Sequence, residues 1–335
     1  MTSVSFGDLA QSFLLQRSNT AIKTTLQSLS TEVTTGIAAD PGKALGGDFG
    51  KVGAIAHTLT TLQAYGLAAT QAALSASAVQ DSLSTLDGQA TALSTSLLTA
   101  GSAGQPTGLQ TVATAARGAL EAAVSALNAR VGSQSLFAGA ATDRPAVASA
   151  DALLASLGPV VAGQTTAAGV AQAVQDWFAS PSGFAAAGYL GSATPASATP
   201  IAPGESAGAS VTALDPAITA TLAGLATAAL IDTGPLVGNA PAQADLATLA
   251  GQALLSSSDA RAGLAARVGV VQARISQAQT RNGSEATALQ LAQSKLLAVD
   301  PYATATALQS TQTQLDTLYA LTARISGLSL TNFLK

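Results

Sequence analysis

Apolar residues recur at seven-residue intervals near both ends of the chain, and this spacing constrains the fold more than any other feature. Near the N-terminus the pairs are Phe6 with Phe13, Ile22 with Leu29, and Leu26 with Val33. Near the C-terminus they are Leu308 with Leu315, and Leu318 with Ile325. A seven-residue repeat places apolar side chains along one stripe of an α-helix, where they face a second helix. The spacing therefore predicts long terminal helices that pair as a coiled coil.

Charge is scarce along these helices and in the rest of the chain. Charged residues make up 10% of the 335 residues, against about 25% in an average soluble protein. A helix in water normally displays Lys, Arg and Glu on its outer face, whereas Ala, Ser, Thr and Gln predominate here. This pattern favours helices packed on several sides by copies of the same chain. The predicted assembly surface consists of Phe6, Leu9, Phe13, Ile22, Leu26, Leu29 and Val33 with Leu308, Leu315, Leu318, Ile325 and Leu328.

The composition leaves little material for catalysis. Cys is absent, which excludes disulfides, thiolate metal sites and cysteine nucleophiles. The one histidine, His57, lies in an expected helix without a carboxylate three or four residues away, and a single histidine excludes His-pair metal motifs. The 14 basic and 18 acidic side chains give a net charge of −4 and no basic footprint for nucleic acid. We therefore expect no enzyme, no catalytic or metal site, no cofactor and no nucleic-acid partner.

The mean hydropathy is positive, at +0.37, but it comes from Ala and not from blocks of Leu, Ile and Val. A membrane-spanning helix needs about 20 mostly apolar residues, and Thr, Ser and Gln interrupt the uncharged stretches 52–80 and 88–116 every few positions. The N-terminus has no basic region and carries Asp8 within its apolar part, which does not fit a cleavable signal peptide. We expect neither membrane insertion nor a cleaved leader.

Two short motifs suggest chemistry, and a structural explanation suits both better. The run from Gly36 to Lys43 resembles a phosphate-binding loop, but five residues rather than four separate its glycines, and Ala44 follows the lysine. We interpret it as a loop between helices. The run from Asn282 to Ser284 matches a glycosylation sequon, but it lies in an expected helix, and such matches are common by chance.

Helix signals extend over most of the chain. The first helix is expected over 6–33 and stopped by Gly36; the last begins at Asp300, an N-cap followed by proline. Between them, apolar periodicity predicts helices over 51–98, 110–131, 218–231 and 243–297.

The middle of the chain, 139–215, differs from its flanks. It carries many of the prolines and alternates short apolar runs with Gly, Ser and Thr turns. We expect a small α+β insert with one short helix over 167–178 and a few short strands. A small core of its own is expected from the aromatic residues Trp177, Phe178, Phe184 and Tyr189.

The expected fold class is mainly α, with the N- and C-terminal helices paired as a coiled coil, a helical rod, and the small α+β insert. Three domains are expected. Residues 1–45 with 298–335 form the terminal coiled-coil domain, 46–138 with 217–297 form the rod, and 139–216 form the insert.

Both ends of the chain resemble the bacterial flagellin family. The matching runs are LSTEVTTGIAADP over 29–41, DPYATATAL over 300–308 and TQLDTLYALTARISGLSLTNFL over 313–334. The last part of this ending, and the run LFAGAATD over 136–143, are similar to the hook–filament junction proteins of the family more than to its filament subunits. The resemblance covers about 1–145 and 222–335, and the insert carries no family motif.

The resemblance implies a structural subunit of the bacterial flagellum that joins hook to filament by self-assembly. It implies secretion by the flagellar export apparatus without a cleaved signal peptide, and an extracellular location. The implied partners are further copies in a ring or tubular layer, a neighbouring hook-associated junction protein, flagellin and an export chaperone.

Two alternatives stay open. One is filament flagellin itself; the other, from a different class, is an adhesin or an enzyme built on a flagellin-like scaffold. An enzyme would need a carboxylate or metal cluster in the insert. The acidic residues of that region are scattered in sequence, at Asp143, Asp151, Asp176 and Glu205.

Overall fold

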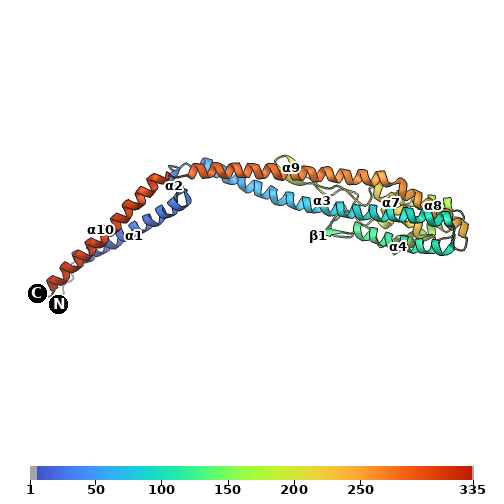
Figure 1. Cartoon of the computed structure of the whole chain (residues 1–335), viewed down its shortest axis with the longest axis horizontal. Coiled ribbons are helices and arrows are strands. Elements are labelled where there is room, and N and C mark those ends of the chain that lie inside the picture. Colours follow the sequence, from blue (N-terminus) through green and yellow to red (C-terminus); the bar gives the residue numbers. More distant parts are fainter. Residues whose placement is uncertain (1–5, 334–335) are drawn as a thin grey trace. The chain divides into compact units, whose positions relative to one another are not determined.

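The chain is mainly helical in its computed structural model (Figure 1). The structure describes residues 6–333, except for the side chains of residues 6–9, 11 and 326–333. The chain divides into two compact units, Met1–Thr61 with Ser284–Lys335, and Leu62–Gly283. The expected fold class is confirmed, because the long terminal helices pack against each other and the strands of the described residues form two small pairs. The division into three domains stays a prediction.

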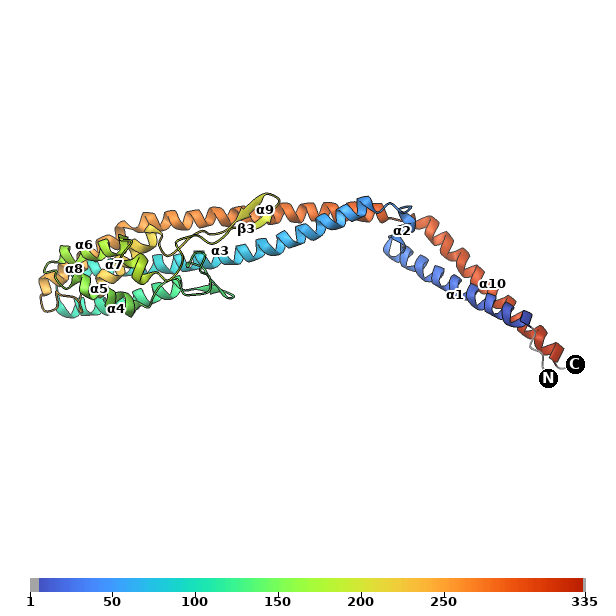
Figure 2. The ribbon, with the colours of Figure 1, turned by 180° about the vertical axis from the view of Figure 1, so that it is seen from behind.

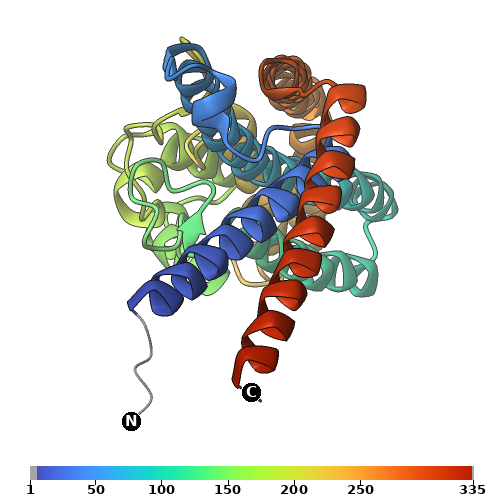
Figure 3. The same cartoon turned by 90° about the vertical axis from the view of Figure 1, so that its left-hand side faces the viewer.

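The first unit is built on helices from both ends of the chain. α1 (Phe6–Thr35) packs against α10 (Pro301–Phe333), and the two lie side by side and antiparallel (Figure 3). A short helix, α2 (Pro41–Ala44), follows α1. The unit also contains the beginning of α3 (Gly50–Ala103) and the end of α9 (Ser258–Leu297).

The turns beside α1 and α10 hold one end of the pair in place. Gly36 ends α1 with a φ of +70°, which glycine adopts without steric cost. The backbone N–H of Ala38 donates to the carbonyl of Leu297 at 2.9 Å, and that of Val299 donates to the carbonyl of Gly36 at 3.1 Å. Asp300 then caps α10, because its carboxylate accepts hydrogen bonds from backbone N–H groups of the first turn.

The second unit gathers shorter helices beside α3 and α9 (Figure 1). They are α4 (Pro106–Leu127), α5 (Ala150–Val161), α6 (Ala167–Ala179), α7 (Pro216–Ala229) and α8 (Ala240–Ser256). A π-helical turn spans Phe184–Gly188. The antiparallel strand pairs are β1 (Arg130–Val131) with β2 (Gln134–Ser135), and β3 (Thr199–Ala202) with β4 (Glu205–Ala207).

α7 lies in the middle of the core of the second unit. Of its 14 residues, 11 are buried, and it packs against α4, α6 and α8. Small residues permit this close packing. A Cβ added to Gly224 would lie 2.6 Å from the side chain of Leu254, and one added to Gly101 would lie 2.9 Å from the backbone of Ala244. Some of the many Ala and Gly residues are thus needed because they let neighbouring helices pack closely.

The segment 139–216 contains two α-helices, where one is expected. α6 confirms the helix expected over 167–178. α5 is an addition, because Pro159 indicates a helix end in the sequence, whereas the structure accommodates it in the last turn of α5. The Oγ of Ser149 caps α5 by accepting the backbone N–H of Ala152 at 3.2 Å.

The aromatic residues of this segment pack together but do not form a core of their own. The ring centroids of Trp177 and Phe178 lie 4.9 Å apart, and those of Phe178 and Phe184 lie 5.1 Å apart. Phe178, Phe184 and Tyr189 belong to one continuous core with α4, α7 and α8. The expectation of a separate core is wrong, because α6 packs directly on α7 and α8.

The β3–β4 hairpin lies along α9 (Figure 2). Ile201 is fully buried in a second, small core between α3 and α9. Its carbonyl accepts a hydrogen bond from Nδ2 of Asn282 at 2.7 Å. Asn282 is the sequon residue, and at 6% exposed its amide is not accessible to a glycan.

Three arginines at seven-residue spacing on α9 form ion pairs with acidic residues of the neighbouring segments. Nη2 of Arg267 lies 2.6 Å from the carboxylate of Asp215. The carboxylate of Glu205 lies between Arg274, at 4.0 Å, and Arg281, with which it forms a close ion pair. These pairs fix the hairpin and the chain before α7 along one side of α9.

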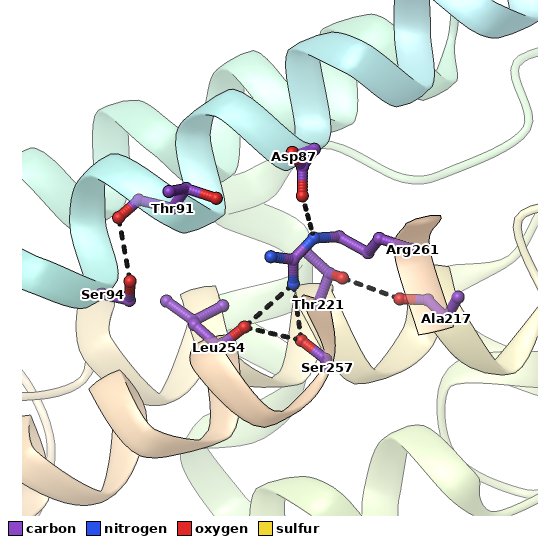
Figure 4. Close-up of polar contacts among 8 residues, drawn as sticks. All are labelled: Asp87, Thr91, Ser94, Ala217, Thr221, Leu254, Ser257 and Arg261. Atoms are coloured by element: carbon purple, nitrogen blue, oxygen red, sulfur yellow. Dashed lines mark hydrogen bonds and ion pairs between the residues drawn. The ribbon is translucent and has the colours of Figure 1, made fainter. Parts of the chain in front are cut away.

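Arg261 joins three helices at the turn from α8 to α9 (Figure 4). Its side chain is 7% exposed, and Nε donates to the carboxylate of Asp87 on α3 at 2.8 Å. Nη1 donates to the carbonyl of Leu254 at 2.9 Å and to Oγ of Ser257 at 2.6 Å. The guanidinium therefore holds the end of α8 against α3.

We predict that Arg261→Met lowers the free energy of unfolding by about 2–4 kcal/mol, because it removes a buried group with three hydrogen bonds and leaves the carbonyl of Leu254 without this donor. Urea unfolding of the full chain, followed by circular dichroism, measures the change. The control is Arg267→Met on the same helix, where the side chain is 63% exposed; an exposed pair contributes less than about 1 kcal/mol. Equal losses for the two variants would contradict the structural role of Arg261.

Candidate assembly surface

α10 presents one partly buried stripe along its length. Its first five members alternate at intervals of four and three residues, and the sixth follows after seven, which is the spacing of a helix seam. They are Thr304, Leu308, Thr311, Leu315, Leu318 and Ile325. The stripe runs from the first turn of α10 to the last side chain that the structure describes in this helix.

α1 carries the matching stripe. The partly buried residues are again separated by four and three positions: Leu15, Asn19, Ile22, Leu26 and Leu29. Because α1 packs against α10, the two stripes face each other and form the seam of the terminal pair. We call these residues of α1 and α10 the terminal seam.

Seven of the residues predicted for assembly lie in the terminal seam, namely Ile22, Leu26, Leu29, Leu308, Leu315, Leu318 and Ile325. Phe13 and Val33 do not, since they are 64% and 43% exposed. Phe6, Leu9 and Leu328 fall among the side chains outside the described ones.

Helix geometry explains the position of Phe13. It precedes Ile22 by nine residues, which is about two and a half turns of an α-helix, so the two side chains point to opposite sides of α1. The repeats Phe6–Phe13 and Ile22–Leu29 each span seven residues, yet they mark different stripes. The seven-residue spacing within each pair does not reveal that the stripes differ. The nine-residue offset between Phe13 and Ile22 does.

Polar residues occupy positions of the terminal seam that an apolar pattern does not reveal. Thr304 and Thr311 are each 7% exposed, and each hydroxyl donates to the carbonyl four residues earlier at 2.8 Å. Asn19 differs, because its Oδ1 is buried and accepts no hydrogen bond from a described residue. An asparagine in a helix seam lowers stability while favouring one register. Thr304, Thr311 and Asn19 could be identified from the sequence by continuing the four–three spacing through polar positions.

Few charges lie on the terminal pair. Nζ of Lys23 lies 6.0 Å from the ring centroid of Tyr319, a cation–π contact between α1 and α10. Oε1 of Glu32 accepts the backbone N–H of Ala39 at 3.0 Å. Glu32 is thus partly buried in the last turn of α1, next to the exposed Val33.

Two other hollows lie among the described residues of the second unit. A hollow of about 600 Å³ is lined in part by Arg117, whose guanidinium pairs with Asp232. Another, of about 530 Å³, is lined chiefly by small residues of α6, α7 and the α8–α9 turn. Among the side chains that the structure describes, no three of His, Asp or Glu gather as metal ligands would. Within the same part of the chain, none of the helices has the length and apolar character needed to span a membrane.

We predict that Asn19→Leu stabilises the terminal pair by about 1–2 kcal/mol, because it replaces a buried acceptor without a partner by an apolar side chain. Amide hydrogen exchange over α1 and α10 in the full chain measures the change as increased protection. Thr20→Leu, at the neighbouring exposed position, is the control and should change protection by less than about 0.5 kcal/mol. Lower protection in the Asn19 variant would show that its amide is bonded across the seam.

Comparison with known proteins identifies the C-terminal part of this arrangement. Residues 250–334 match the family model of the bacterial flagellin C-terminal helical region. The match begins in α8, includes α9, and covers the α10 half of the terminal seam. No curated protein sequence matches the chain significantly. Flagellins are structural, non-enzymatic proteins of the bacterial flagellum. Residues 250–334 of the chain are thus similar to the C-terminal helical region of bacterial flagellins.

Proposed function

We propose that the chain joins hook to filament in the bacterial flagellum and assembles through its terminal helix pair. The match of residues 250–334 to the flagellin C-terminal helical region supports the coarser statement, a structural role in the flagellum. The finer statement, a junction subunit, is our proposal. It rests on the physical character of the terminal pair and on two sequence runs that are similar to junction proteins.

The pairing of α1 with α10 is the observation that carries the proposal. The side of α1 away from the terminal seam displays Thr20, Thr24 and Thr31, which are exposed and whose hydroxyls donate to carbonyls of their own helix. These three hydroxyls are uncharged and already hydrogen-bonded. Covering them with another helix therefore costs little desolvation free energy. A two-helix pair with few charges on its outer faces suits packing among copies.

The run LFAGAATD over 136–143 has a structural explanation that is compatible with this role. Phe137 is fully buried, and its carbonyl accepts the backbone N–H of Ala213 at 3.0 Å. Gly139 has a φ of +59°, and a Cβ there would lie 2.3 Å from the carbonyl oxygen of Ser192. The glycine is therefore required where the chain enters the segment 139–216. The run supports a shared architecture with junction proteins and not a chemical activity.

The proposal includes the partners and location expected of such a subunit. It would lie outside the cell, in contact with further copies in a ring or tubular layer. Its neighbours along the flagellum would be a hook-associated junction protein on one side and flagellin on the other. An export chaperone would bind it before secretion by the flagellar export apparatus.

Deletion of the gene tests the junction role. We predict hooks without filaments, together with flagellin secreted into the medium, because filament subunits would lack the layer on which they assemble. Electron microscopy of the cells and immunoblotting of the medium give the two readouts, and a plasmid copy should restore filaments.

Each alternative gives a different result. If the chain is the filament subunit itself, hooks are bare and no other flagellin accumulates in the medium. If it is an adhesin or an enzyme on this scaffold, filaments are normal. Either result would contradict the junction role.

A further inference from the structure

The side of α1 that faces away from α10 carries an exposed aromatic ring beside a positive charge. Phe13 is 64% exposed on this side, and Leu14, which is 63% exposed, lies about 100° round the helix from it. Arg17 follows Phe13 by four residues and lies on the same side of the helix. A shallow hollow of about 470 Å³ lies here, lined by Phe13, Gln16, Arg17, Thr20 and Ala21.

α10 carries a group of opposite charge in a similar setting. Asp316 is exposed. Tyr319 follows it by three residues, which places the two side chains next to each other on the helix surface, and it is 45% exposed. α10 therefore carries a negative charge beside an exposed aromatic ring. α1 carries a positive charge beside an exposed aromatic ring.

Arg17 and Asp316 differ from Lys23 and Glu32 on the terminal helices, whose charged groups contact other described residues; they share this with Arg324 on α10. Lys23 contacts the ring of Tyr319, and Glu32 accepts a backbone N–H. Among the side chains that the structure describes, Arg17 and Asp316 form no ion pair with each other or with any other residue. On helices that are otherwise nearly uncharged, opposite charges set register and partner choice when such helices meet.

We propose that Arg17 of one copy forms an ion pair with Asp316 of a second copy, with Phe13 and Tyr319 packed beside it. The inference rests on the proposed function, since it names the contact by which the terminal pairs of neighbouring copies meet. The contact is heterologous: each chain offers Arg17 to one neighbour and Asp316 to another. Repetition of such a contact builds a ring or an open helical array and not a closed dimer.

Charge reversal tests the ion pair in assembled flagella. We expect Arg17→Asp and Asp316→Arg each to lower the amount of chain recovered in purified flagella about tenfold. The double variant Arg17→Asp/Asp316→Arg should return to within about twofold of the native amount, because the pair is restored with its signs exchanged. Secretion of each variant into the medium, measured by immunoblotting, shows that export is unaffected.

Arg324 supplies the matched control, since it is an exposed arginine on α10 and the competing partner for Asp316. Arg324→Asp alone should leave the recovered amount within about twofold of native. Single variants without effect, or a double variant as poor as the single ones, would overturn the Arg17–Asp316 pair and leave the proposed function standing. Rescue of Asp316→Arg by Arg324→Asp would also overturn it, in favour of a contact between α10 helices.

Cysteine cross-linking gives a second readout, because the chain has no native Cys. Chains with Arg17→Cys and chains with Asp316→Cys are expressed together beside the native chain, so that a disulfide can join only different copies. We expect at least tenfold more cross-linked dimer than from Gln27→Cys with Asp316→Cys, since Gln27 lies about 15 Å further along α1. Equal yields from flagella that contain the variants would overturn the pair. Absence of even the native chain from flagella would contradict the proposed function itself.

Discussion

The packing of α1 against α10 brings together two segments separated by more than 260 residues of chain, and every contact proposed between copies depends on it. Its terminal seam is not uniformly apolar. Leu and Ile alternate with Thr304 and Thr311, whose hydroxyls are satisfied within α10, and with Asn19, whose carbonyl oxygen has no described donor. Such a seam specifies a register but gives less stability than an all-aliphatic one. A pair of modest stability can gain further from contacts with other copies.

The unusual composition has two physical consequences. In the second unit, small residues such as Gly224 and Gly101 let helices approach closely around α7. On the terminal helices, the small number of charges on the outer faces lowers the cost of covering them. Some of the few charges hold elements together, as in Arg261 with Asp87 and the arginines of α9 with Glu205. Arg17 and Asp316 form no ion pair among the described residues, so both side chains are available to another copy of the chain.

Most of the helical architecture could be predicted from the sequence, because apolar periodicity and caps such as Asp300 are local signals. The members of the terminal seam could be predicted only in part. Phe13 shares a heptad with Phe6 but not the phase of Ile22, and Asn19 and Thr311 are invisible to an apolar pattern. The seven-residue row from Arg267 to Arg281 is visible in the sequence. Its acidic partners lie 52 to 76 residues away, so only the tertiary structure identifies them.

Incorporation of a Leu318→Asp chain into flagella tests the role of the terminal seam most directly. Leu318 lies within the seam, next to the exposed Thr317, and a carboxylate in a packed seam costs several kcal/mol unless the site opens to water. In a strain lacking the native gene, we predict that the Leu318→Asp chain is secreted but absent from purified flagella, and that the cells are non-motile. The matched variant Thr317→Asp should assemble and restore motility. A Leu318→Asp chain that assembles as well as Thr317→Asp would place the assembly surface elsewhere.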